Sequence, residues 1–473
     1  MSVHEGATPE QHSLPESYRS VKLPTNASRF RKFFTFAGPA YLVSVGYMDP
    51  GNWATDLEGG SRFGYRLLWV VLLSNLMAIL LQILCARLGL VTGKDLAQAC
   101  KSYCKKPAAT ALWIICELAI IACDLAEVIG SAIALNLLFG LPLFWGVIIT
   151  GFDVLLLIAL THFGFRKLEA VILALVGAVA ACFALEVIRA HPVWGSVAGG
   201  MFVPHKLVGE QLYVALGILG ATVMPHNLYL HSSIVQTRAV HRTPKGLKQA
   251  IKYNTLDTVI ALMLAFFVNA SILILAAAVF HTSGKTVTDL SEAHTLLRPL
   301  LGGAAATAFA IALLASGQSS TITGTLAGQI VMEGFMEWKI NPVVRRLITR
   351  SLAIVPAAAI ILIRNGSGLE DLLIFSQVAL SMQLGFAVFP LLFFTSDKKL
   401  MGKFVNPLIV KILGYGTGIA IAALNTKLLI DHIGYYWLSG IVIAATLFSC
   451  WVKWGWKEPA KQANNPPTLE ATP

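Results

Sequence analysis

Two short motifs combine a helix-breaking proline with side chains that can bind a cation. The first is Asp49-Pro50-Gly51-Asn52, the second is Met224-Pro225-His226-Asn227, and each lies within a long apolar run. Proline lacks a backbone donor and clashes with the preceding turn, so we expect a helix to break at Pro50 and at Pro225. Each break frees backbone carbonyl oxygens beside polar side chains. The two motifs together therefore have the chemistry of a cation site.

The candidate ligands follow from the two breaks. They are the Asp49 carboxylate, the Asn52 amide oxygen, the Met224 thioether and the backbone carbonyls of Ala221 and Gly46. Each carbonyl lies four residues before a proline, which cannot donate the usual helical hydrogen bond to it. Oxygen ligands suit any divalent ion, but hard ions such as Mg²⁺ and Ca²⁺ gain nothing from a thioether. Met224 therefore favours Mn²⁺, Fe²⁺ and heavier transition metals.

A second polar set follows one face of an apolar helix predicted over 109–138. Glu117, Asp124 and Glu127 are spaced seven and three residues apart, which places them on one side of that helix. Acids at membrane depth are costly unless they are paired, protonated or hydrated. We expect Arg345 and Arg346 to be their counter-charges. The set is either a structural ion-pair network or a chain of titratable groups that carries protons.

Two histidines follow the second break. Histidine titrates near neutral pH, so His226, directly after Pro225, is a candidate for proton handling or gating. The alternative is a structural histidine bonded to the backbone. His231 lies about 140° further round the helix, so the two rings do not face one target, and His231 is the weaker candidate.

The elements that position these residues are apolar helices. The chain has 473 residues, of which 56% are hydrophobic and 13% charged, and its mean hydropathy is +0.69. A soluble domain has about 25% charged residues, so soluble and disordered proteins are excluded. We predict an all-α polytopic membrane protein with about twelve spans of some 20 residues each. The predicted spans are 36–60, 66–90, 109–138, 142–161, 168–190, 211–237, 253–280, 304–334, 347–363, 369–395, 405–426 and 433–452.

The basic residues indicate how these spans are oriented. With both termini inside, the inner segments hold 26 Lys and Arg residues and the outer loops hold 8. Because positive residues stay on the cytoplasmic side, we predict cytoplasmic tails over 1–35, which we expect to be disordered, and over 453–473. The net charge of +11 then reflects topology and contact with anionic lipid, with no nucleic-acid partner. Short loops favour a bacterial inner membrane, with the chain as a monomer.

The two broken spans lie five spans apart. A matching pair of interrupted spans in two halves of a chain points to a transporter's binding site at mid-membrane. We therefore predict a five-plus-five inverted repeat, with repeats over 36–190 and 211–395 and two further helices over 405–452. The alternative is a pair of unrelated proline kinks.

The DPGN and MPHN motifs, with the GATVMPH run around the second, resemble the NRAMP family of proton-coupled divalent-metal transporters, and its bacterial manganese branch most. The resemblance covers roughly 36–452. It implies a LeuT-type fold, import of Mn²⁺ or Fe²⁺ as cargo, protons as the coupling ion, and no other cofactor. It also implies that Gln377, in the run FSQVALSMQ, joins the other ligands. Many relatives have alanine where this chain has Gly46.

The resemblance further implies a proton route. Acids matching Asp124 and Glu127, with an arginine pair matching Arg345 and Arg346, lead protons towards the cytoplasm in that family.

Three other classes of function compete with metal transport, and one of them, a channel, is disfavoured because a pair of proline-broken helices favours alternating access. A carrier of the same fold for an amino acid or an organic cation is the first, although Asp49 would repel a substrate carboxylate at this site. An enzyme is the second, but the sequence has no HExxH motif, no GxSxG elbow and no paired catalytic carboxylates. We therefore expect no enzymatic activity.

Overall fold

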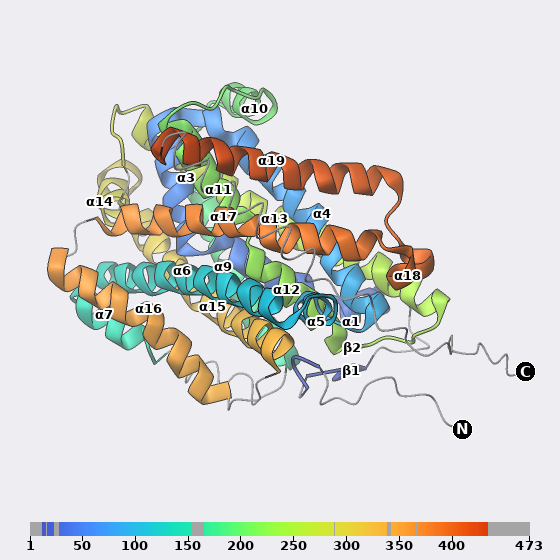
Figure 1. Cartoon of the computed structure of the whole chain (residues 1–473). Helices are drawn as coiled ribbons and strands as arrows, with labels where there is room; N and C mark the ends of the chain where they lie inside the picture. Colours follow the sequence, from blue (N-terminus) through green and yellow to red (C-terminus); the bar gives the residue numbers. More distant parts are fainter. Residues whose placement is uncertain are drawn as a thin grey trace, which may run out of the picture.

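The computed structural model describes residues 12–15, 17–22, 28–152, 165–287, 289–337, 342–364 and 368–433, and these are mostly helical (Figure 1). The long helices are α4 (Leu68–Thr92), α6 (Lys106–Phe139), α9 (Phe165–Ala190), α13 (Pro244–Ala276), α15 (Gly303–Met336), α16 (Pro342–Arg364), α17 (Leu369–Ser396) and α19 (Leu408–Ile433). The shorter ones are α1 (Arg29–Phe36), α2 (Pro39–Val45), α3 (Pro50–Phe63), α5 (Leu96–Tyr103), α7 (Leu143–Thr150), α10 (Trp194–Phe202), α11 (Glu210–Thr222), α12 (Pro225–Ile234), α14 (Leu290–Leu301) and α18 (Lys398–Met401).

Short turns and two strands complete the described elements. The 3₁₀ turns are Gly46–Met48, Gly64–Leu67, Val235–Thr237 and Gly402–Phe404, and a π-type turn covers Ala277–His281. The strands β1 (Val21–Lys22) and β2 (Arg238–Ala239) pair in parallel. The N-terminal region, expected to be a disordered tail over 1–35, thus contains β1 and helix α1, and those parts are ordered.

Several helices suit a membrane. Among the described residues, six helical segments are long and apolar enough to cross one. They are Pro50–Thr92, Arg166–Ala190, Pro244–His281, Gly303–Met336, Asp371–Ser396 and Leu408–Asp431. Residues 153–161 of the predicted span 142–161 and nearly all of the predicted span 433–452 lie outside the described residues.

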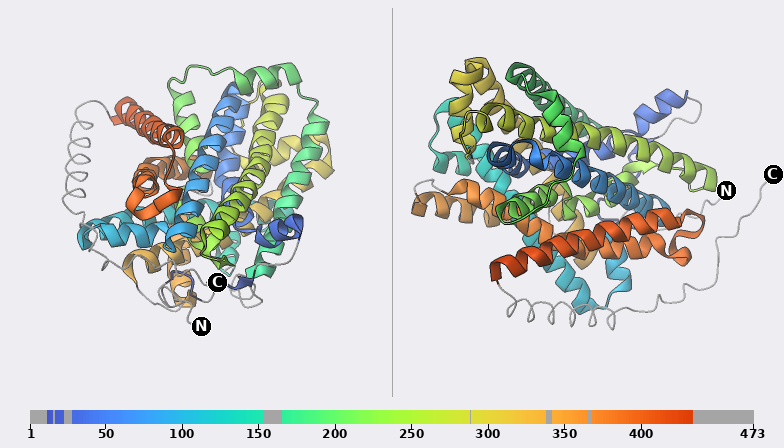
Figure 2. Two further views of the ribbon diagram at one scale, coloured as in Figure 1. Left: turned by 90° about the vertical axis from the view of Figure 1, so that its right-hand side faces the viewer. Right: turned by 90° about the horizontal axis from the view of Figure 1, so that it is seen from above.

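Apolar side chains cover much of the surface, whereas polar ones are buried inside. On α19, Leu408 and Ile409 are each 71% exposed, and Figure 2 shows this helix along the outside of the bundle. The interior instead holds carboxylates and amides, among them Asp49, Asn52 and Glu127, all at most 1% exposed. This distribution fits a surrounding lipid phase, because polar groups at membrane depth must face protein.

The first motif interrupts a helix. Helix α2 ends at Val45, a 3₁₀ turn follows, Asp49 is extended (φ −68°, ψ 166°), and α3 begins at Pro50. The local sequence explains this geometry. Asp49 is the N-cap of α3, since its side chain accepts a hydrogen bond from the Asn52 amide, and proline is preferred at the first helical position.

The second motif interrupts another helix in the same manner. Helix α11 ends at Thr222, Met224 is extended (φ −69°, ψ 124°), and α12 begins at Pro225. Around the two interruptions, α3 packs on α11, α13 and α17, and α12 packs on α4 and α15. Helices α6 and α15 lie side by side next to this core (Figure 1).

Candidate metal centre

A hydrogen-bond network joins the two interruptions. Asp49 Oδ1 accepts from the Asn52 backbone amide at 2.8 Å and from Asn52 Nδ2 at 2.7 Å. The same Asn52 Nδ2 donates to the Ala221 carbonyl at 3.1 Å. Three of the predicted ligands are therefore in direct contact, and all are at most 1% exposed.

The Asn52 amide oxygen faces a residue that sequence analysis missed. Asn269 on α13 donates from Nδ2 to Asn52 Oδ1 at 3.2 Å and to the Tyr47 carbonyl at 2.8 Å. Because Asn52 turns its nitrogen toward Asp49, binding a cation through its oxygen requires the amide to rotate. Asn269 is then the neighbour that must release it.

Met224 and a cysteine lie beside Asp49. Met224 is fully buried and packs with Cys123 of α6 and Leu380 of α17. The Cys123 thiol lies 3.9 Å from Asp49 Oδ2, the carboxylate oxygen that Asn52 does not occupy. A thioether and a thiol are thus gathered next to one carboxylate.

Two glycines permit the close approach of the surrounding side chains. A Cβ at Gly51 would lie 1.8 Å from Gln377 Nε2, so Gln377 of α17 lies directly against the first motif. A Cβ at Gly46 would lie 2.4 Å from Asn227 Nδ2, so the first interruption also contacts the second motif. The predicted residues Gln377 and Gly46 are both at the junction.

The two histidines have different surroundings. His231 Nδ1 lies 3.0 Å from Gln82 Oε1, and Gln82 Nε2 donates to the Tyr47 hydroxyl at 2.7 Å. This buried chain ties α12 to α4 and to the 3₁₀ turn before Asp49. His226 is 1% exposed, and its Nδ1 has no hydrogen-bond partner within the described part of the chain.

The α6 acids meet an arginine that sequence analysis gave no role. Glu127 Oε2 lies 3.7 Å from Arg350 on α16, and Arg350 also donates to the Thr321 hydroxyl at 3.1 Å. Arg345 and Arg346 belong to α16, but their side chains lie outside the described residues. An arginine within a predicted span was itself a signal, because such a charge needs a partner.

The three predicted acids do not share one environment. Asp124 is 3% exposed, and a Cβ at Gly324 would come within 3.1 Å of its Oδ1 and 3.3 Å of Glu127 Oε1. Both acids therefore face the small residues of α15. Glu117 is only partly buried and accepts from the Trp113 indole on its own helix at 3.0 Å.

A buried arginine clamps the start of α2 at the end of the bundle where the strands lie. Arg238 is fully buried, and it donates to both Glu169 oxygens at 2.8 and 3.1 Å. It also donates to the carbonyls of Phe36 and Ala37 at 2.8 and 2.9 Å. The backbone before α2 is thereby fixed to α9 and β2.

The same end of α2 is capped by a second buried acid. Asp257 of α13 accepts from the Gly38 amide at 3.3 Å and from the Ala40 amide at 3.0 Å. A carboxylate there satisfies amides that have no partner within the helix. Together with Arg238, it holds this half of the interrupted helix in place.

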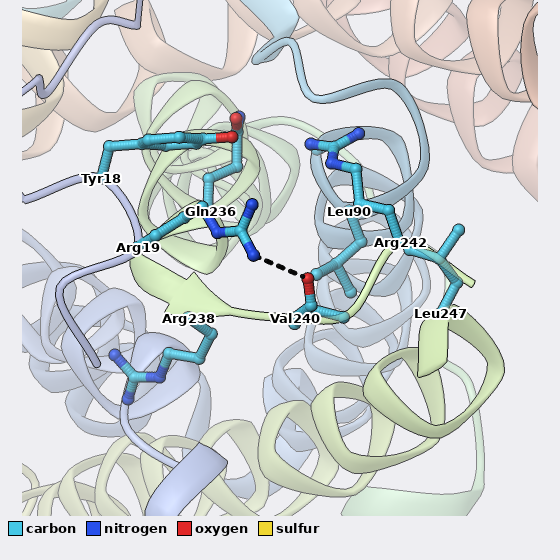
Figure 3. A pocket seen from close by; sticks show the side chains of 9 residues that line it. Tyr18, Arg19, Leu90, Gln236, Arg238, Val240, Arg242 and Leu247 are labelled. Atoms are coloured by element: carbon cyan, nitrogen blue, oxygen red, sulfur yellow. Dashed lines mark hydrogen bonds between the residues drawn. The ribbon is translucent and has the colours of Figure 1, made fainter. Parts of the chain in front are cut away.

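Residues 12–15 and 17–22, here called the N-terminal strap, pack over this clamp. Val21 pairs with Arg238 through β1 and β2, and the Arg19 amide donates to the Gln236 carbonyl at 3.1 Å. Figure 3 shows the Arg19 guanidinium directed at the Val240 carbonyl, 3.4 Å away, while Arg238 points elsewhere. The strap therefore contacts the chain on both sides of Arg238.

The other end of the strap meets α5. Ser13 donates to Asp95 Oδ2 at 2.5 Å, and Asp95 also caps α5 through the Gln98 amide at 2.9 Å. Burial raises the pKa of Asp95 to about 6, although these hydrogen bonds lower it. The Ser13 hydroxyl is therefore one of the few groups that stabilise the ionised carboxylate.

Comparison with known proteins identifies the family. The family model described as "Natural resistance-associated macrophage protein-like" (Nramp) matches residues 40–431. The chain belongs to the Nramp family. A relative from Listeria monocytogenes, named divalent metal cation transporter MntH, is 56% identical over 421 residues, which cover 88% of this chain and 94% of the relative. The MntH of a Nostoc species is 56% identical over 431 residues, with 90% and 97% covered.

Solved structures agree with this family membership. A manganese transporter from Eremococcus coleocola matches with a TM-score of 0.84 and 38% identity, covering 93% of this chain and 96% of its own. The nucleobase-cation-symport transporter Mhp1 matches with a TM-score of 0.56 at 16% identity, covering 88% and 92%, which shows a shared fold. The family and the LeuT-type all-α fold class predicted from the sequence are confirmed.

Proposed function

We propose that this chain imports divalent transition-metal ions, such as Mn²⁺ and Fe²⁺, into the cytoplasm together with protons. The observation that carries the proposal is the single Asn52 amide that bonds both Asp49 and the Ala221 carbonyl. It brings a carboxylate, an amide and a backbone oxygen to one buried point, next to the Met224 thioether. The curated relatives named as divalent metal cation transporters support the same cargo.

The site binds cations and not anions because Asp49 carries the negative charge. Gln377 Oε1 and His226 Nδ1 are buried and without hydrogen-bond partners among the described residues, which suits additional ligand or proton-accepting roles. Alternating access would open the buried site to one side at a time, by moving one part of the repeat bundle against the other.

Protons would leave along α6 in this proposal. Asp124 and Glu127 lie on α6, which packs against α3, the helix that Asp49 caps. Arg350 is the counter-charge among the described side chains, and Arg345 and Arg346 lie nearer the start of α16. In this proposal both termini, the strap and the Arg238 clamp face the cytoplasm, and the membrane is a cell (inner) membrane. The chain acts as a monomer in this proposal.

Uptake into proteoliposomes tests the function as a whole. We expect Mn²⁺ uptake accompanied by acidification of the lumen, with little competition from excess Ca²⁺ or Mg²⁺. Absence of Mn²⁺ uptake in liposomes that contain folded, inserted protein would overturn the proposal. It would favour an organic-cation carrier in which Asp49 pairs with a substrate amine.

The methionine ligand predicts the selectivity. Met224→Ala should retain Mn²⁺ uptake but allow Ca²⁺ and Mg²⁺ to compete, because a soft thioether disfavours hard ions only while it lines the site. We expect the competitor concentration that halves uptake to fall by about tenfold, or roughly 1.4 kcal/mol. Met401→Ala, which removes a buried methionine of α18, is the matched control. Unchanged competition in Met224→Ala would remove Met224 from the site.

The proton route predicts a separation of the two fluxes. Asp124→Asn should reduce the acidification that accompanies uptake far more than it reduces Mn²⁺ binding. A positioned acid or base contributes roughly 10²–10⁴-fold to proton transfer, so a loss of at least about tenfold is expected. Asp431→Asn, which changes a partly exposed acid paired with Lys427, is the control. Normal acidification together with weakened Mn²⁺ binding in Asp124→Asn would contradict this route.

A further inference from the structure

Cys123 occupies a position that the proposed function leaves without a role. It lies on α6, is 1% exposed, and packs with Met224 and Leu380. Its Sγ is 3.9 Å from Asp49 Oδ2 and 3.8 Å from Glu127 Oε1. The thiol therefore lies between the candidate metal centre and Glu127, one of the two acids of the proposed proton route.

The separation between the thiol and the carboxylate fits two ligands of one ion. Zinc–sulfur and zinc–oxygen bonds are about 2.3 Å and about 2.1 Å long, so two such donors on one ion lie at most about 4.4 Å apart. The 3.9 Å between Cys123 Sγ and Asp49 Oδ2 is inside that limit. Asn52 occupies Asp49 Oδ1, so Oδ2 is the oxygen that faces the sulfur.

A second, independent observation concerns the surrounding side chains. Gln377 is fully buried against Gly51, and its Oε1 has no hydrogen-bond partner among the described residues. Met224 supplies another sulfur in the same cluster. A buried oxygen without a donor, on a side chain packed against the first motif, is more typical of a metal ligand set than of a packed apolar core.

We propose that Cys123 is a second sulfur ligand of this metal centre, and that it sets the preference for thiophilic ions such as Cd²⁺ relative to Mn²⁺. This inference rests on the proposed function, because it takes Asp49 as a metal ligand. A thiol loses its proton when it binds a metal. Glu127 Oε1, 3.8 Å away, is the acceptor for that proton.

Sulfur and oxygen at this position differ most for a soft ion. Thiolate ligands strengthen the binding of soft metals and do little for harder ones, so losing the sulfur should weaken Cd²⁺ far more than Mn²⁺. A cysteine that only fills space would give a different result, since replacing it would change both affinities together or neither.

Calorimetry on the full-length protein separates these outcomes. We expect Cys123→Ser to lower Cd²⁺ affinity by about tenfold or more and Mn²⁺ affinity by less than about threefold. The ultraviolet sulfur-to-cadmium charge-transfer band of the native protein should disappear in the same variant, a change that altered packing alone would not produce. Cys116→Ser, a fully buried cysteine two turns earlier on α6, should leave both the affinities and the band unchanged.

Failure of the proposed ligand role can be distinguished from failure of the proposed function. An unchanged ratio of Cd²⁺ to Mn²⁺ affinity, an equal loss of both, or a persistent charge-transfer band in Cys123→Ser would overturn the ligand role. Cys123→Ala provides a second variant, whose side chain has no atom that can bind a metal. We expect its ratio of Cd²⁺ affinity to Mn²⁺ affinity to fall as well. If neither ion binds the native protein, the proposed function is refuted, and the ligand role of Cys123 is refuted together with it.

Discussion

Asp49→Ala should abolish measurable Mn²⁺ binding. The carboxylate is the charged ligand of a buried site, and its Oδ1 also holds the Asn52 amide through two hydrogen bonds. The substitution therefore removes a ligand and the group that orients its neighbour. Deleting one partner of a buried charge pair costs about 3–5 kcal/mol, which corresponds to a loss of affinity of roughly 10²–10⁴-fold. Titration calorimetry of the purified protein measures this directly.

Two comparison variants make this result specific. Asp49→Asn keeps an oxygen that can cap α3, so it should retain the fold while still losing most of its affinity. Asp371→Ala, which removes an exposed acid at the start of α17, should bind Mn²⁺ as the native protein does. Binding by Asp49→Ala at native affinity would refute the site.

Arg238→Met should strongly destabilise the end of the molecule proposed to face the cytoplasm. The change would leave Glu169, which is 5% exposed, with Arg166 as its remaining ion-pair partner. It would also remove the hydrogen bond to the Phe36 carbonyl and one of those to the Ala37 carbonyl. Removing one partner of a buried ion pair costs about 3–5 kcal/mol. Thermal unfolding in detergent should show a lowered midpoint. Hydrogen exchange should be faster in the amides around α2.

The paired charge provides an internal check. Arg238→Met combined with Glu169→Leu removes both charges and should recover a large part of the lost stability, because Glu169 is then no longer a buried carboxylate that has lost Arg238. Arg242→Met changes an exposed arginine near the strap and should have little effect. Equal midpoints for Arg238→Met and Arg242→Met would show that the clamp contributes nothing.

The interruptions could be predicted from the sequence because their cause is local. Proline blocks a helix wherever it occurs inside one, and an aspartate before it makes a good N-cap. The pairing of Asp49, Asn52 and Ala221 followed from the same reasoning, since a break frees the carbonyl that the amide then meets. Composition alone indicated an all-α membrane protein, whereas the LeuT-type fold was implied by the family resemblance.

The partners across the interface could not be predicted, because they depend on which helices become neighbours. Asn269 and Gln82 come from α13 and α4, and nothing in their own sequence surroundings indicates a site. Cys123 had one signal, since it lies one turn before Glu127 on the same face of α6. Asp56 had another, seven residues after Asp49, and it is 1% exposed with neither oxygen hydrogen-bonded among the described residues.

The strap was missed for a different reason. A two-residue strand shows no periodicity, and polar residues such as Ser13 and Arg19 are typical of a solvated tail. Leu14, 4% exposed, was the buried apolar side chain of the described strap that could have indicated packing. Pairing between such short segments is determined by position in the finished fold and not by local propensity.

The parallel pairing of Val21 with Arg238 also determines how early the strap can dock during synthesis of the chain. The strap is made before α2, whereas its partner strand β2 is made only after α12. During that time the strap has no β2 to bind, and the contact must close a very long loop. The strap can therefore pack over the Arg238 clamp only once both interrupted helices have been made. Docking of the strap is therefore a late step of assembly.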